Sequence, residues 1–218
     1  MQDYTHIVLV LDRSGSMQSI KTDAIGGYNA FIKSQQAVPG KATFSLAQFN
    51  QSYDLLQDFV DLRNARILDD QNYQPAGTTA LLDAIGKTSH VVGEKLFSLN
   101  EEIRPDKVVF VILTDGMENA SKDCTRDRIK EIIKEQQEVY NWQFVFLSSD
   151  LDSFHDAQKW GIPAGQTLSM AATPEAARAG YDSLAVTMCA YRSGNRKNMA
   201  FSQEDRDRQE KEKKRTPR

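Results

Sequence analysis

Two uninterrupted apolar segments, residues 7–11 and 108–113, constrain the fold most strongly. The first reads Ile-Val-Leu-Val-Leu and the second Val-Val-Phe-Val-Ile-Leu. Short runs of this kind are typical of strands that are buried on both faces, as in a parallel sheet covered by helices. Even the longer run is too short to cross a bilayer as a helix, so no membrane-spanning segment is expected.

The rest of the chain alternates between helical and strand patterns. Apolar residues recur at helical spacing in five segments, namely 19–37, 79–97, 125–140, 153–160 and 174–191. Further strands are predicted at 42–49, 53–60, 142–147 and 167–170. The short link at 50–52 predicts a hairpin between two of these strands. We therefore expect a doubly wound α/β fold with a mainly parallel six-stranded sheet, one antiparallel edge strand and helices on both faces.

The length of 218 residues indicates one domain with an appendage, which we place at residues 1–195 and 196–218. Twelve of the sixteen residues in 203–218 are charged and none is apolar, so we expect a frayed helix or a disordered tail. The net charge of −3 argues against a strongly basic nucleic-acid-binding protein. The N-terminus lacks the pattern of a signal peptide, and a cytoplasmic location is predicted.

Three polar clusters follow predicted strands or open a predicted helix. They are Asp12-Arg13-Ser14-Gly15-Ser16, Gly77-Thr78-Thr79 and Thr114-Asp115-Gly116. Ligands of open α/β sheets bind outside the carboxyl ends of the strands, so these clusters are expected to converge. They would contribute two carboxylates and three hydroxyls without histidine or cysteine. Such hard oxygen donors suit Mg²⁺ or Mn²⁺ rather than zinc.

The same clusters resemble the von Willebrand factor type A domain family. The matching elements are Asp12-x-Ser14-x-Ser16, Gly-Thr-Thr-Ala-Leu-Leu-Asp-Ala-Ile at 77–85 and Leu-Thr-Asp-Gly at 113–116. The resemblance covers about residues 4–191, and residues 11–17 are similar to stand-alone bacterial and phage members. In this family the three elements form a metal-ion-dependent adhesion site.

The resemblance implies a set of metal ligands, which are Asp12, Ser14, Ser16, Thr79 and Asp115. Family sequences commonly read Gly-Gly-Thr-Pro-Leu and place an Ala-Leu pair six residues after the threonine. Counting back from Ala84-Ile85 selects Thr79, and Thr78 is kept as the alternative.

The resemblance also implies a function. In the family the hydroxyls bind the cation directly, the acids often act through water, and an acidic residue of a partner protein completes the coordination. We therefore expect a metal-dependent protein-binding module, with Arg13, Met17 and Gln18 as candidate residues on the rim of the site. The main alternative is a scaffold or chaperone-like subunit of a bacterial stress, tellurite-resistance or phage-associated complex, in which the cation is structural. Bacterial members are often paired with AAA+ ATPases or kinases, so the resemblance makes an AAA+ ATPase or an operon-encoded protein a candidate partner.

The sequence supports an enzymatic function less well than a protein-binding function. A phosphatase of the haloacid-dehalogenase type would use Asp12 as its nucleophile and needs a second aspartate two residues later, where this chain has Ser14. Neither the G-x-S-x-G motif of serine hydrolases nor the G-x-x-x-x-G-K-[ST] motif of P-loop proteins is present. We expect no enzymatic activity. Glu118 and Asn119 lie beside Asp115, where they either support the site or belong to an ordinary loop.

Overall fold

The computed structural model describes residues 3–171 and 173–215, and its centre is a six-stranded sheet in the order β3-β2-β1-β4-β5-β6. The strands are β1 (Tyr4–Asp12), β2 (Lys41–Phe49), β3 (Tyr53–Asp61), β4 (Lys107–Thr114), β5 (Gln143–Ser148) and β6 (Thr167–Ser169). Strand β3 pairs antiparallel with β2, and every other pairing is parallel. The predicted fold class, with its antiparallel edge strand, is confirmed.

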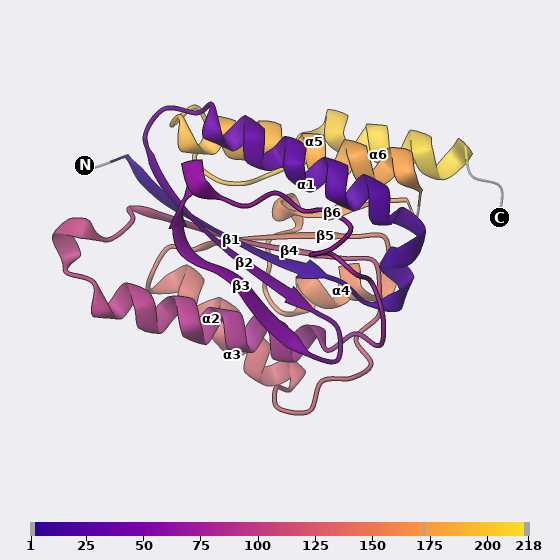
Figure 1. Cartoon of the computed structure of the whole chain (residues 1–218), viewed down its shortest axis with the longest axis horizontal. Coiled ribbons are helices and arrows are strands. Elements are labelled where there is room, and N and C mark those ends of the chain that lie inside the picture. Colours follow the sequence, from indigo (N-terminus) through magenta and orange to yellow (C-terminus); the bar gives the residue numbers. More distant parts are fainter. Residues whose placement is uncertain (1–2, 172, 216–218) are drawn as a thin grey trace.

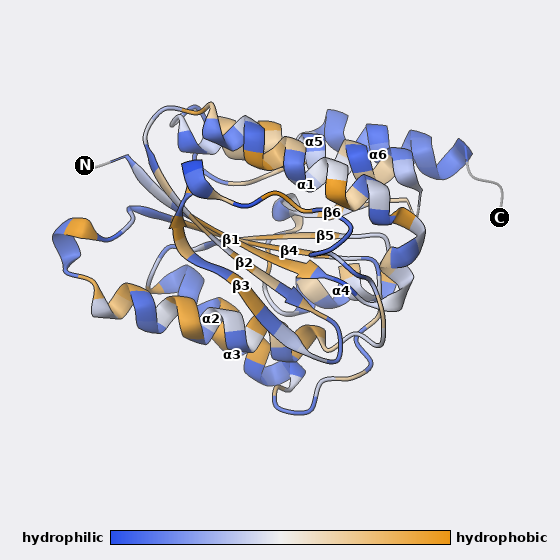
Figure 2. Cartoon of the chain, in the orientation of Figure 1, coloured by the Kyte–Doolittle hydropathy of each residue, from blue (hydrophilic) through white to orange (hydrophobic). Residues whose placement is uncertain are grey.

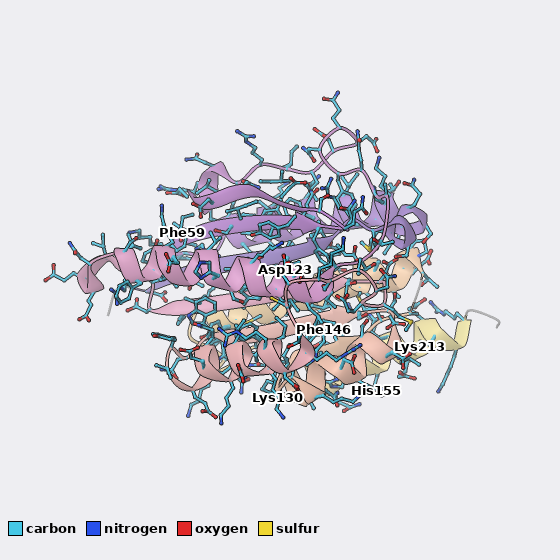
Figure 3. The ribbon with its side chains drawn as sticks, turned by 90° about the horizontal axis from the view of Figure 1, so that it is seen from below. Phe59, Asp123, Lys130, Phe146, His155 and Lys213 are labelled. Carbon is cyan, nitrogen blue, oxygen red and sulfur yellow. The ribbon has the colours of Figure 1, made fainter. Side chains whose placement is uncertain are left out.

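Helices cover both faces of the sheet (Figure 1). One layer contains α1 (Lys21–Gln36), α5 (Pro174–Arg192) and α6 (Gln203–Arg215). The other contains α2 (Leu81–Ser98), α3 (Arg126–Glu138) and α4 (Leu151–Lys159). Figure 3 shows this second layer from outside, with Lys130 of α3 and His155 of α4 on its surface. The described residues also contain four short 3-10 helices, η1 (Gly15–Ile20), η2 (Leu62–Asn64), η3 (Glu101–Ile103) and η4 (Ala164–Gln166).

The two helical layers explain why the central strands are apolar without interruption. In β1, Ile7, Leu9 and Leu11 pack into the core beneath α1 and α5. Val8 and Val10 point the opposite way, into the core beneath α2 and α3. Successive side chains of a strand alternate between the two faces of the sheet. When both faces are covered by helices, every position faces a core, and apolar residues are favoured throughout. Figure 2 shows the resulting apolar centre, with hydrophilic residues gathered on the outer surfaces of the helices.

The C-terminal segment is helical, which is one of the two forms expected for it, and it is not a disordered tail over residues 203–215. Residues 203–215 form helix α6, which packs against α5. Gln209 is almost fully buried, and its side chain accepts a hydrogen bond from the Ala171 N–H and donates one to the Ala176 carbonyl. Arg206 donates to three backbone carbonyls, those of Ala164, Gly165 and Thr167. Polar contacts to backbone groups therefore hold this helix, although they leave no apolar periodicity in the sequence.

The segment that leads into α6 is also part of the fold. Met199 and Phe201 are buried in the core shared by α1 and α5, beyond the predicted boundary at residue 195. Within the described residues, no helix is long and apolar enough to cross a membrane.

Candidate metal centre

The predicted site lies where β1 and β4 end, at the same edge of the sheet (Figure 1). A loop before α2 is held against the residues that follow β1 by two backbone hydrogen bonds. Gly15 donates its N–H to the Gly77 carbonyl at 3.0 Å, and Ala76 donates to the Arg13 carbonyl at 2.9 Å. These bonds bring the first two polar clusters together, and the pairing of β1 with β4 adds the third.

Three hydroxyl groups and one carboxylate surround a small volume beside Gly116. The Ser14 and Ser16 Oγ atoms lie 3.0 Å apart, and the Ser16 hydroxyl donates to Asp115 Oδ1 at 2.7 Å. A Cβ atom built on Gly116 would lie 2.8 Å from Thr79 Oγ1, 3.2 Å from Ser16 Oγ and 3.4 Å from Ser14 Oγ. Only a glycine at this position leaves the space between the hydroxyls open.

Asp12 lies at the base of this cluster and is fully buried. Its Oδ1 accepts a hydrogen bond from the Ser14 N–H at 2.6 Å, and its Oδ2 accepts one from the Thr114 hydroxyl at 2.5 Å. Burial raises the pKa of Asp12 to about 6, although both hydrogen bonds act in the opposite direction. Burial also raises the pKa of Asp115, against the effect of the Ser16 hydrogen bond. A cation beside these carboxylates would favour their charged forms.

The two candidate threonines occupy different environments. Thr79 is 3% exposed, and its hydroxyl belongs to the cluster beside Gly116. Its backbone exchanges hydrogen bonds with Asn119, whose side-chain oxygen accepts from the Thr79 N–H and whose own N–H donates to the Thr79 carbonyl. Thr78 is exposed, and its N–H donates to Gln51 Oε1. The geometry therefore favours Thr79 over Thr78 as a ligand.

Two further carboxylates hold the loop after β4 against the start of α2. Glu118 accepts hydrogen bonds from the Leu82 N–H in α2 and from the N–H groups of Ala120 and Ser121 in its own loop. In the opposite direction, Asp83 of α2 accepts from three consecutive N–H groups of the loop, at residues 122–124. Glu118 and Asn119 thus support the site, the first of the two roles considered for them.

Sequence reasoning missed several of the supporting groups. Thr114 appeared only as a neighbour of Asp115, yet its hydroxyl binds Asp12. No sequence motif points to Tyr73, whose hydroxyl donates to the Asp12 carbonyl at 2.7 Å. Asp83 lies in the first turn of α2, where an acidic residue is a common helix signal. Nothing in the sequence indicates that its carboxylate binds a loop about forty residues away.

One of the three rim candidates is wrongly placed by the prediction. Met17 is fully buried in the core, because η1 turns its side chain inward beneath α1. Arg13 forms an ion pair with Asp54, and Gln18 is exposed. Two apolar side chains outside the predicted rim, Met117 in the loop after β4 and Leu151 at the start of α4, are 52% and 56% exposed at this edge of the sheet.

The donor set fits a hard divalent cation. It combines two carboxylates with three neutral hydroxyls, and oxygen donors of this type suit Mg²⁺ and Mn²⁺. No group of three or more His, Cys, Asp or Glu side chains in the described parts of the chain is arranged to hold a metal. His6 is buried in the sheet against Thr43 and Ser45, and burial lowers its pKa to about 3, which leaves it neutral.

Comparison with known proteins identifies the family to which the chain belongs. The model of the von Willebrand factor type A domain matches residues 6–158. The chain belongs to this family. A comparison with curated proteins finds no match.

Solved structures with this fold come from distant proteins. The vWF domain of the type V pili tip protein Mfa5 from Porphyromonas gingivalis superimposes with a TM-score of 0.59 at 11% identity, covering 84% of this chain and 94% of that one. The pilus adhesin SpaC from Lactobacillus rhamnosus GG superimposes with a TM-score of 0.63 at 14% identity, covering 86% of this chain and 30% of SpaC. Proximal thread matrix protein 1 from the mussel byssus was solved with a zinc-occupied MIDAS motif. It superimposes with a TM-score of 0.59 at 12% identity, covering 85% of this chain and 46% of the mussel protein. This chain spans less than half the length of the mussel and SpaC structures.

Proposed function

We propose that this von Willebrand factor type A domain is a metal-dependent protein-binding module. Asp12, Ser14, Ser16, Thr79 and Asp115 would hold one Mg²⁺ or Mn²⁺ ion. An acidic residue of a partner protein would supply a further oxygen ligand. The observation that carries the proposal is the convergence of the three hydroxyls beside Gly116, with Asp115 at hydrogen-bond distance from Ser16.

The composition of the site supports recruitment of an anion. Three of the five ligands are uncharged, so a bound divalent cation would keep an affinity for one more carboxylate. A hydrogen-bonded or ionic contact of this kind contributes about 1.5–3 kcal/mol. That is too little for tight binding, so contacts with the surrounding loops must add specificity. Arg13, Gln18, Met117 and Leu151 are the side chains we assign to this rim.

The mussel protein with its zinc-occupied motif supports the use of this kind of site for divalent metals. The choice of Mg²⁺ or Mn²⁺ for this chain rests on its oxygen donors. The SpaC and Mfa5 structures belong to pilus proteins, so the cytoplasmic location expected from the sequence stays a prediction. We also propose that the protein has no catalytic activity of its own, because Ser14 stands where an aspartyl phosphatase needs its second carboxylate.

A scaffold role is the second candidate. The network of Glu118 and Asp83 makes the site part of the structural link between the loop after β4 and α2. A cation there would stabilise this link without touching a partner. In that case an AAA+ ATPase or another operon-encoded protein would bind a different surface.

A pull-down in Mg²⁺ and in EDTA distinguishes the two functions. The tagged protein is incubated with lysate, and captured proteins are identified by mass spectrometry. We expect chelation and Asp115→Ala to release the same partner, whereas Asp182→Ala, which changes an exposed aspartate of α5, should retain it. A partner that stays bound in EDTA would contradict recruitment through the metal and favour the scaffold.

A further inference from the structure

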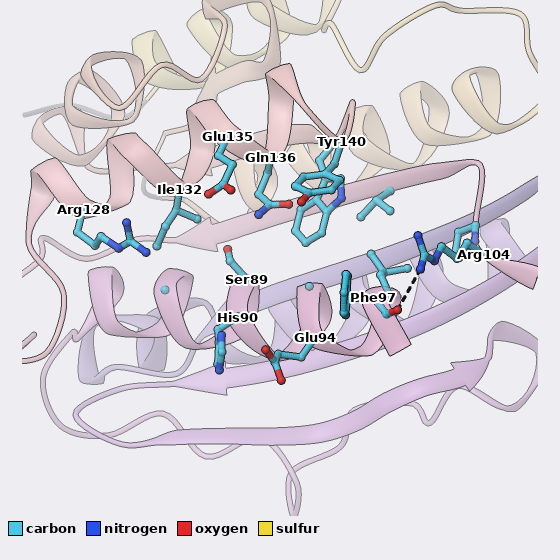
Figure 4. A pocket seen from close by; sticks show the side chains of 16 residues that line it. Ser89, His90, Glu94, Phe97, Arg104, Arg128, Ile132, Glu135, Gln136 and Tyr140 are labelled. Atoms are coloured by element: carbon cyan, nitrogen blue, oxygen red, sulfur yellow. Dashed lines mark hydrogen bonds between the residues drawn. The ribbon is translucent and has the colours of Figure 1, made fainter. Parts of the chain in front are cut away.

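A cavity lies between α2 and α3, and none of the proposed metal ligands lines it. It has a volume of about 380 Å³, and the apolar part of its mixed lining is formed by Leu96, Phe97, Val108, Ile132, Tyr140 and Trp142 (Figure 4). Val108 is near the start of β4 and Asp115 follows its end, so this part of the cavity lies about 20 Å from Asp115 along the strand. Phe97 and Tyr140 are 82% and 57% exposed at the mouth of the cavity.

The cavity contains a buried polar atom without a partner. Ser89 of α2 is 3% exposed, and its Oγ has no hydrogen-bond partner among the described residues. Figure 4 shows the Ser89 hydroxyl pointing into the space between the helices, toward Glu135 and Gln136 of α3. A buried hydroxyl that lacks a hydrogen bond is unfavourable, and a ligand that supplied one would remove this penalty.

A missing side chain on the same helix face keeps the cavity open. Gly93 lines the cavity, and a Cβ atom built on it would meet no other atom within 4 Å. Glycine disfavours a helix interior, so its presence there is not explained by helix stability. Gly86, one turn before Ser89, is different because a Cβ atom there would clash with Cys124 Sγ. The packing of the protein itself therefore accounts for Gly86 but not for Gly93.

The charges around the cavity favour a neutral ligand. Arg104 and Arg128 are balanced by Glu94 and Glu135. The Arg104 guanidinium donates to the carbonyls of Phe97 and Leu99, which end α2. Arg128 is paired with Glu131. Because the lining contains two arginines and two glutamates, its formal charges sum to zero, and neither an anion nor a cation finds an excess of opposite charge.

We propose that this cavity binds a small, neutral aromatic molecule that carries one N–H or O–H group. Its ring would pack against Phe97, Tyr140 and Trp142, and its polar group would bond to Ser89 Oγ. The aromatic wall supplies the contact area, and the hydroxyl supplies orientation. This site shares no residue with the proposed metal centre.

Indole and indene test the proposal, because the two molecules have nearly the same shape and only indole has an N–H group. Binding to the full chain is followed by two-dimensional NMR of its backbone amides. We expect indole to shift amides of 86–97 and 128–142 saturably, with a dissociation constant of about 1 mM or tighter for so small a ligand. Indene should bind about fivefold more weakly, and Ser89→Ala should reduce indole to the affinity of indene.

A pair of glycine variants tests the location. Gly93→Leu should fill the cavity and abolish the shifts. Gly26→Leu should leave them unchanged, because Gly26 of α1 also has open space around its Cβ position but lies on the other face of the sheet. Unsaturable shifts, equal binding of indole and indene, or retained binding in Gly93→Leu would each overturn the proposal.

Discussion

Gly116→Ala should impair metal binding without removing a single ligand. The added methyl group would lie 2.8 Å from Thr79 Oγ1 and 3.2 Å from Ser16 Oγ, inside the space that the hydroxyls enclose. The backbone of Gly116 has no positive φ angle, so alanine fits its conformation. The substitution therefore acts on the geometry of the site rather than on its chemistry or on the fold.

The expected loss of metal affinity follows from the crowding of the added methyl group against the hydroxyls. Inserting a methyl group into a filled site costs about 2 kcal/mol when its neighbours must move, which corresponds to roughly 30-fold weaker binding. With Mg²⁺ at 100 times the dissociation constant, the unmodified protein gains about 2.7 kcal/mol, or about 6 °C in melting temperature for a chain of this size. At the same Mg²⁺ concentration the variant should gain about 2 °C.

Differential scanning calorimetry with and without Mg²⁺ measures both shifts. Gly26→Ala is the matched control, because its new methyl group meets no atom within 4 Å and lies in a helix. It should raise the stability of the metal-free protein by about 0.5–1 kcal/mol and keep the full Mg²⁺ shift. A full Mg²⁺ shift in Gly116→Ala would refute the placement of the cation among these hydroxyls.

Three further predictions concern the same site. Asp12→Ala should abolish Mn²⁺ binding in calorimetric titration while far-ultraviolet circular dichroism shows an intact fold, and unchanged affinity would remove Asp12 from the ligand set. Mg²⁺ affinity should fall about tenfold per pH unit below pH 6, because burial raises the pKa of Asp12 to about 6 and the protonated carboxyl is a poor metal ligand. Equal Mg²⁺ affinities at pH 5 and pH 7.5 would contradict this. Deleting residues 203–218 should leave metal affinity unchanged in the same titration but lower the melting temperature, because Gln209 and Arg206 lose their hydrogen bonds to the backbone.

The sequence predicts those parts of the fold that depend on local patterns. The apolar run at 7–11 predicts a doubly buried strand, and Ile7 and Val8 indeed face opposite cores. The ends of β1 and β4 could be placed side by side because parallel strands carry their carboxyl ends to one edge. The convergence of Ser14 and Asp115 then follows from topology, without any knowledge of side-chain contacts.

Long-range contacts between polar groups are beyond this reasoning. Asp83 binds three N–H groups of a loop near residue 123, and Gln209 binds backbone groups of 171 and 176. Such contacts produce no periodicity, so the sequence does not indicate the contacts of Asp83, and for the segment that contains Gln209 it leaves a frayed helix and a disordered tail as alternatives. Met17 was misplaced for a related reason, because a single 3-10 turn decides whether its side chain faces solvent or the core.

The environment of Asp12 connects the fold to the proposed function. Its carboxylate is held by Ser14 and Thr114 at the end of the central strand, where burial disfavours its charge. A more exposed aspartate would be ionised at little cost and would gain less from a neighbouring cation. Burial therefore raises the free energy of the metal-free charged state, and a divalent cation relieves it. The same burial lets protons compete with the cation below pH 6, so metal binding and pH sensitivity have one physical origin.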